Sequence, residues 1–197
     1  MTTLALLFIL HAEPGWTLAG SDRAFDARWY TRSVPDRPVN ELKATGVVDA
    51  PLEQVQRVLL DFEGYARVMP STAASRVLAR DSERSAWVYL RYDVGVLSPR
   101  DTVVRMSWSA EGDVRWLRWT AAGARDELAP VADGVVRLPV NEGSWLLEAR
   151  GQKTFVTYQL LSVPGGAVPA FLVNSINGAG VPRTLEALER AARGAAR

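Results

Sequence analysis

The stretch TFVTYQLLSVPGGAVP, residues 154–169, joins a strand-like run to a helical one. Phe155–Ser162 is rich in β-branched, aromatic and other apolar residues, which favours a strand. The glycines and prolines of 163–169 indicate a turn, and apolar residues then recur at helical spacing from Pro169 to about Arg193. A helix of that length extends about 37 Å. The stretch therefore predicts a strand that leads into a long C-terminal helix, able to cover the mouth of a sheet.

Three helix-weakening residues fall in the middle of this helical run, at Gly178, Gly180 and Pro182. Glycine has more conformational freedom to lose in a helix, and proline lacks the backbone donor that a helix needs. We therefore expect a kink or a short break there.

A train of strand-like runs precedes the stretch, each separated from the next by Gly, Pro, Asp or Asn. The intervals are too short for the crossovers of a parallel sheet. The runs are 25–34, 41–48, 74–80, 86–93, 102–109, 114–121, 135–140 and 144–149. One helix interrupts them after Asp49-Ala50-Pro51, where Asp49 can cap the first turn. Its apolar stripe is Val55, Val58, Leu59 and Phe62. The order predicts an α+β fold with a meandering antiparallel sheet.

Composition limits the function classes. The 197 residues are 48% hydrophobic and include 23 basic and 22 acidic residues, a net charge of +1. That balance is unlike a nucleic-acid binder, so we expect no nucleic-acid partner. Cysteine is absent and His11 is the only histidine, which removes thiolate and imidazole chemistry from the rest of the chain. We expect no cofactor and no metal site.

The N-terminal residues 1–15 have two interpretations. Leu4–Leu10 is continuously apolar and too short to span a bilayer. A secretory signal would supply such a core, with Ala12 as its last residue, although no Lys or Arg precedes the run. The other interpretation is a buried N-terminal helix or strand. The first places the protein in the periplasm or outside the cell, and the second in the cytoplasm. Residues 16–197 form one domain in either case.

The strand run 86–93 carries large side chains on both faces. Trp87, Tyr89, Arg91 and Asp93 share one face, and Val88, Leu90, Tyr92 and Val94 share the other. Further bulky residues follow at Trp108, Trp116, Trp119 and Trp145. Either these rings pack against the two helices, or the sheet and the long helix enclose a hollow with a few polar anchors, as small-molecule sites do.

Short motifs recur along most of the chain: GVVDAP at 46–51, Asp61 at the end of the first helix, SPRD with TVVR at 98–105, GVVR at 134–137, TFVTY at 154–158 and VPGGAVP at 163–169. Together they resemble the START domain, the lipid-transfer family of the helix-grip fold. The likeness runs from about Trp16 to Leu188. Two departures stand out: Thr102 occupies a position where the family commonly has an aromatic residue, and the acid and base of sterol-binding members align nearest to Arg91 and Met106. A sterol anchor is therefore not evident.

The resemblance implies a curved antiparallel sheet wrapped around the C-terminal helix, with a tunnel for one lipid between them and the helix as a gate at Gly178, Gly180 and Pro182. We interpret Arg100 and Asp101 as a structural ion pair that ties strand to loop. Arg91 is a candidate anchor for a phosphate or carboxylate head group. The cavity candidates are Trp87, Tyr89, Arg91, Met106, Tyr158, Phe171 and Ile176.

These observations predict a non-enzymatic, monomeric carrier that binds, and transfers, a lipid or other hydrophobic small molecule, with transient membrane contact. The alternative is a polyketide cyclase or aromatase on the same fold, with Tyr89, Arg91, Asp93 and Tyr158 as candidate groups. A third class is an interaction module whose pocket is filled by side chains, which a volume below about 300 Å³ would favour.

The signal interpretation makes a direct prediction. Protein produced in its native host should lack residues 1–12 and begin at Glu13, because Ala12 is the expected last residue of the signal. Mass spectrometry of the intact chain measures this. A mature chain that still begins at Met1 or Thr2 would eliminate the signal interpretation.

Overall fold

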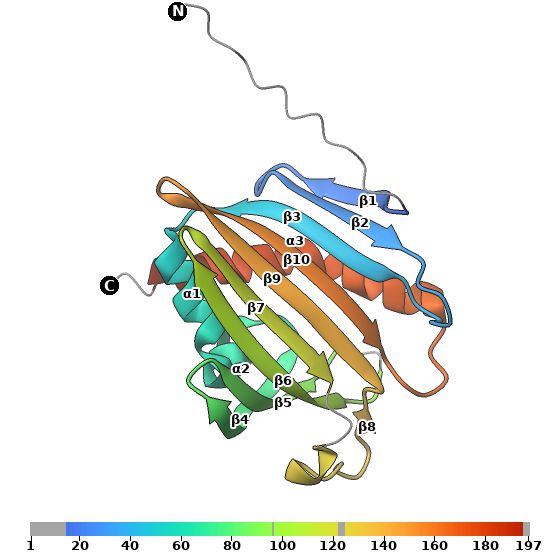
Figure 1. Ribbon diagram of the computed structural model, residues 1–197. Helices are drawn as coiled ribbons and strands as arrows, with labels where there is room; N and C mark the ends of the chain where they lie inside the picture. The colour runs from blue at the N-terminus through green and yellow to red at the C-terminus, as the bar shows by residue number, and fades with distance from the viewer. Residues whose placement is uncertain (1–14, 96, 122–124, 195–197) are drawn as a thin grey trace, which may run out of the picture.

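A computed structural model describes residues 15–95, 97–121 and 125–194. Ten strands form one sheet that curves around the long helix α3 (Figure 1). The strands are β1 (Thr17–Asp22), β2 (Ala27–Arg32), β3 (Glu41–Val48), β4 (Thr72–Ser82), β5 (Ser85–Tyr92), β6 (Arg100–Glu111), β7 (Val114–Ala121), β8 (Val136–Arg137), β9 (Val140–Arg150) and β10 (Lys153–Val163). The helices are α1 (Leu52–Leu60), α2 (Tyr65–Val68) and α3 (Ala170–Gly194), with 3-10 turns at Phe62–Gly64 and Asp126–Leu128.

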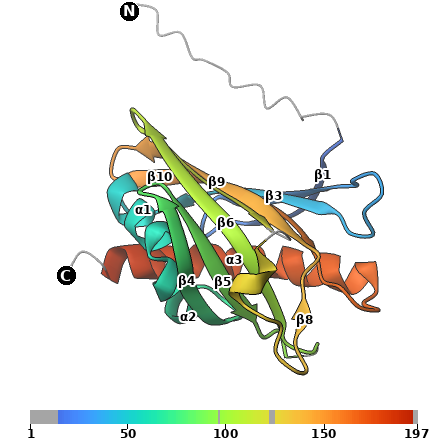
Figure 2. The same cartoon turned by 60° about the horizontal axis from the view of Figure 1, so that its bottom comes forward.

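The sheet order is β1-β2-β3-β10-β9-β7-β6-β5-β4. All neighbours in this order are antiparallel, as the short intervals predict. The short strand β8 is the exception, because it pairs with β6 in parallel. Figure 2 shows α3 running along one face of the sheet, with α1 and α2 beside it. The predicted α+β helix-grip architecture is confirmed.

The strand predictions are closest in the middle of the sheet. The runs 41–48 and 114–121 coincide with β3 and β7, whereas the run 135–140 shrinks to the two residues of β8. The edge strand β1 was not predicted, because its residues are mostly exposed and lack an apolar alternation. Gly20 in β1 leaves room for the ring of Trp29, since a Cβ atom there would lie 2.3 Å from it.

The first helix buries the predicted stripe, and Val55, Val58, Leu59 and Phe62 all lie in the core. The predicted cap is wrong: Pro51 occupies the N-cap position, and no side chain caps the helix. Asp49 forms ion pairs with Arg193 and Lys153 instead. Its backbone N–H also donates to Glu189 of α3 at 2.9 Å. Asp49 therefore links the end of β3 to the end of α3.

The helix α3 is unbroken from Ala170 to Gly194, with Pro182 inside it, so the short break considered above is absent. Side chains supply hydrogen bonds to carbonyl groups in the turn that proline disturbs. Thr184 Oγ1 donates to the Gly180 carbonyl at 3.0 Å, and Arg183 Nε donates to the Ala179 carbonyl at 3.3 Å. Among the described residues, no helix has the length and apolarity to cross a membrane.

The turn from β10 into α3 depends on glycine. Gly165 and Gly166 have φ angles of 65° and 66°, in the left-handed region that other residues rarely adopt. The two glycines let the chain reverse directly from the sheet onto its concave face. These positive φ angles explain why two glycines stand in the VPGGAVP sequence at 163–169.

A buried ion pair ties β6 to β8. Asp101 is 0% exposed, and its carboxylate accepts hydrogen bonds from Arg137 Nε at 2.7 Å and Nη2 at 3.2 Å. Arg137 also donates to Asp126 and to the Ala129 carbonyl, each at 2.7 Å. The expected ion pair between Arg100 and Asp101 is wrong. Asp101 pairs with Arg137 instead, because alternation along β6 turns the side chains of Arg100 and Asp101 to opposite faces.

Removing this carboxylate should destabilise the fold. Asp101→Asn removes the buried carboxylate and leaves the Arg137 guanidinium with only the more exposed Asp126 as an anionic partner, so the free energy of unfolding should fall by about 3 kcal/mol. Urea unfolding measures the change. Glu186→Gln is the control, because its pair with Arg190 is exposed and should contribute less than about 0.5 kcal/mol. Equal effects of the two substitutions would contradict the structural role of Asp101.

Candidate functional site: a cavity between the sheet and the C-terminal helix

A cavity of about 260 Å³ lies between the concave face of the sheet and α3. The helix α2 and the loop that follows it line one side. The volume is just under the roughly 300 Å³ at which drug-sized sites begin, so the space suits a small ligand better than a two-chain lipid. The apolar residues that the strands contribute are Leu42, Leu90, Met106, Leu117 and Leu160.

One face of α3 forms the opposite wall. Its lining residues recur every three or four positions, as one helix face requires. No heavy atom outside its immediate neighbourhood lies within 4 Å of the position that a Cβ atom at Gly180 would take. The middle of the helix therefore faces open space. The residues of this face are Val173, Ile176, Asn177, Gly180, Val181 and Thr184.

Aromatic rings and one amide line the part of the cavity formed by β7, β9 and β10. The Tyr158 ring packs on Trp145 and Trp119, with centroid distances of 4.4 and 6.0 Å. Trp119 Nε1 donates to Asn141 Oδ1 at 3.2 Å, and Asn141 Nδ2 donates to the Tyr92 hydroxyl at 3.2 Å. This network fixes the orientation of the rings.

The buried phenols of the cavity do not ionise near neutral pH. Burial raises the pKa of Tyr92 to about 12, and burial also raises the pKa values of Tyr65 and Tyr158. Tyr65 donates its hydroxyl hydrogen to the Leu59 carbonyl at 2.6 Å. The phenols can therefore form hydrogen bonds but cannot act as bases at neutral pH.

The charged lining residues are all cationic. Arg100 and Arg183 line the cavity, and no Asp or Glu of the described residues does. Arg100 is only 7% exposed; its Nη1 donates to the Ser98 carbonyl, and its Nε has no partner. Within the described ranges, no three His, Cys, Asp or Glu side chains gather closely enough to hold a metal ion.

This combination of a curved sheet, a long helix and an apolar cavity agrees with the sequence comparison. Residues 48–189 match the family described as polyketide cyclase / dehydrase and lipid transport. The chain belongs to this family. Its resemblance to START domains is also confirmed at the level of the fold.

Three relatives illustrate the similarity. An uncharacterized protein of Pseudomonas aeruginosa is 26% identical over 90% of this chain and 86% of its own length. A STAR-related lipid transfer protein from Xanthomonas axonopodis is 29% identical, with a TM-score of 0.79 over 91% of this chain and 99% of that fragment. Human STARD10 is 22% identical, with a TM-score of 0.80 over 92% of this chain and 74% of its own.

Four of the residues predicted to bind the ligand or to gate the cavity line it in the structure. These are Met106, Tyr158, Ile176 and Gly180. Arg100, expected in an ion pair, lines it as well. The roles of these residues in ligand binding and gating stay predictions. Of the other gate residues, Gly178 faces the Trp29 ring of β2, with 3.5 Å from its ideal Cβ position to Trp29 Nε1, and Pro182 is not among the lining residues.

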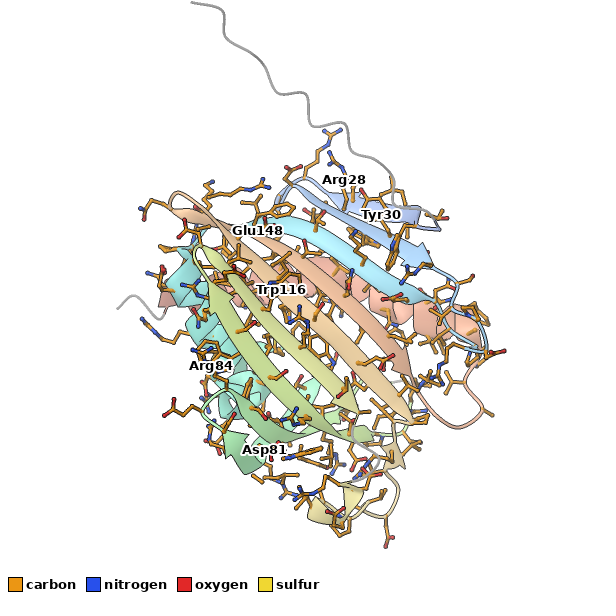
Figure 3. The ribbon with its side chains drawn as sticks, in the orientation of Figure 1. Arg28, Tyr30, Asp81, Arg84, Trp116 and Glu148 are labelled. Atoms are coloured by element: carbon orange, nitrogen blue, oxygen red, sulfur yellow. The ribbon has the colours of Figure 1, made fainter. Side chains whose placement is uncertain are left out.

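The placement of Trp87, Tyr89 and Arg91 in the cavity is wrong. Alternation along β5 directs Leu90 and Tyr92 inward, so the three candidates lie on the convex face. There the Trp87 ring packs under Arg125 and the Tyr89 ring under Arg76. Figure 3 looks onto this convex face, which also carries Trp116 of β7.

Phe171 is also outside the cavity. It lies in the first turn of α3 and is 75% exposed, away from the helix face that begins with Val173. Sequence reasoning missed Arg100, Tyr92 and Asn141 as lining residues. The apolar alternation of Val88 and Leu90 could have placed Tyr92 inward, whereas no sequence signal distinguishes Asn141.

The raised phenol pKa values predict a late step in an alkaline titration. Phenols of the unfolded chain ionise near pH 10, whereas Tyr92 of the native protein ionises at about 12. The unfolded state therefore binds fewer protons between these two values, so stability should fall as the pH rises from about 10 to about 12. Ultraviolet absorbance of tyrosinate, in native and urea-unfolded protein, measures the two titrations. Coincident titrations would contradict the buried environment.

Proposed function

We propose that the protein is a carrier that binds one hydrophobic small molecule in the cavity between the sheet and α3. The observation that supports this is the cavity itself, with apolar walls on both sides and open space at Gly180. Burial of an apolar ligand there stabilises the complex by about 25 cal/mol for each Å² removed from water. Its lining holds no residue that acts as a base at neutral pH among those described.

The volume of about 260 Å³ lies on the side of the 300 Å³ criterion that favours an interaction module with a filled pocket. The open space beside Gly180 supports a carrier instead, because no side chain fills the cavity there. The small volume limits the size of the ligand rather than removing the site. A compact or single-chain molecule is the class that this volume supports.

The alternative function is that of a polyketide cyclase, since the family description includes cyclases and dehydrases. Of the four groups considered for such chemistry, only Tyr158 lines the cavity. Tyr89 and Arg91 are on the convex face, and the exposed Asp93 accepts a hydrogen bond from the Gly95 backbone at 3.0 Å. The binding function therefore has more support than the catalytic one.

Transfer between membranes, a monomeric state and export belong to the same proposal. The exposed Phe171 gives the start of α3 an apolar contact for a membrane surface. A carrier of this kind would load and release its ligand during transient contact. The segment 1–14, on which export depends, lies outside the described residues.

A cavity-filling substitution tests the proposal. Gly180→Leu places an apolar side chain in the open space, and leucine has a higher helix propensity than glycine, so the substitution should not weaken α3. Native mass spectrometry and organic extraction of protein from its own host should find one apolar molecule for each wild-type chain and at least about tenfold less in the variant.

Gly194→Leu is the matched control, because Gly194 lies in the same helix, is exposed and does not line the cavity. It should retain the molecule at wild-type occupancy. A wild-type protein that is reproducibly empty would overturn the carrier function. Full occupancy in Gly180→Leu would show that the ligand binds somewhere else.

A further inference from the structure

The cavity wall contains a buried cation with no anionic partner. Arg100 begins β6, is 7% exposed and lines the cavity. A buried guanidinium stays charged and can only donate hydrogen bonds. Its neighbour Asp101 cannot neutralise it, because that carboxylate is on the opposite face and binds Arg137. No described residue forms an ion pair with Arg100.

One edge of this guanidinium is available. Nη1 donates to the Ser98 carbonyl, whereas Nε has no partner, and Nη2 has none among the described residues. Nε and Nη2 carry parallel N–H groups on one edge of the guanidinium plane. That edge matches two oxygens of a carboxylate or phosphate, which arginine binds with two parallel hydrogen bonds.

A second unpartnered donor faces the same cavity from α3. Asn177 lines the cavity, and its buried Nδ2 has no hydrogen-bond partner. A buried donor without an acceptor is unfavourable, so both Arg100 and Asn177 favour a ligand that brings oxygen acceptors. Arg183 adds a further positive charge at the exposed side of the lining, where it would attract an anion.

We propose that the ligand is an amphiphilic acid: a small apolar body with one ionised oxygen head group, a carboxylate or a phosphate monoester, bound by Arg100. This inference rests on the proposed carrier function and specifies its ligand class. The apolar walls hold the body, and Arg100 selects the head group. Arg91, the earlier candidate for this role, lies outside the cavity.

Three ligands of equal chain length test the inference: decanoate, decyl phosphate and decanol. Isothermal titration at neutral pH of protein freed of co-purified molecules gives the three dissociation constants. At least one anion should bind about tenfold or more tightly than decanol, as charge-assisted hydrogen bonds in a buried site predict. The tighter of the two anions identifies the head group.

Two arginine variants separate the head-group role from a structural one. Arg100→Met should abolish the preference for the anion and change the affinity for decanol by less than about threefold, since the apolar walls remain. Arg91→Met, outside the cavity, should keep the wild-type preference. If Arg100→Met does not fold, Asn177→Leu should reduce the preference while decanol still binds.

The outcomes distinguish this inference from the proposed function. If wild-type protein binds decanol as tightly as both anions, the head-group inference is wrong and the carrier function stands. If Arg100→Met weakens all three ligands equally, Arg100 supports the cavity and does not recognise the head group. If none of the three binds, both proposals are overturned.

Discussion

The docking of α3 onto the sheet at both of its ends is the constraint on which the cavity depends. At its C-terminal end, Leu185 and Leu188 lie in the main core, and Arg193 pairs with Asp49. At its N-terminal end, Val173 packs in a second apolar cluster. Asn174 Oδ1 nearby accepts a hydrogen bond from the Asn40 backbone at 3.1 Å. Between these two anchors the helix spans the curved sheet, and the hollow lies beside its middle turns, where Gly180 meets no packed side chain.

The cavity leaves buried polar groups without hydrogen-bond partners, which a fully packed core would not do. A protein interior normally satisfies its donors, yet Arg100 Nε and Asn177 Nδ2 are both buried without partners. The penalty is tolerable because the rest of the sheet supplies a large packed core around Val88, Val104 and Val156. The apolar lining belongs largely to this same core, whereas the two unpartnered donors are left able to recognise a ligand.

The sequence was sufficient to predict the architecture but not which strand face is internal. The turn at 163–169, the helix after it and the short intervals between strands are local signals, and local backbone physics decides them. The face of β5 is different, because alternation defines two faces without saying which is inside. Tyr89 lies on the convex face, which accommodates aromatic rings where arginines such as Arg76 stack on them. The sequence did not predict Arg100 in the cavity lining, because an Arg-Asp dipeptide suggests an ion pair. Along a strand, adjacent side chains point to opposite faces, so Arg100 faces the cavity while Asp101 does not.

The described lining residues supply hydrogen-bond donors and apolar surface for the proposed binding function. A general base for proton abstraction needs a pKa near the working pH, and the phenols of Tyr92 and Tyr158 have pKa values raised far above neutrality. The guanidinium and the amide donate hydrogen bonds but do not remove protons at neutral pH. Under the carrier proposal, a ligand in this cavity is held by burial and by hydrogen bonds. The buried donors of Arg100 and Asn177, which have no partner in the protein, would then contribute to the binding energy.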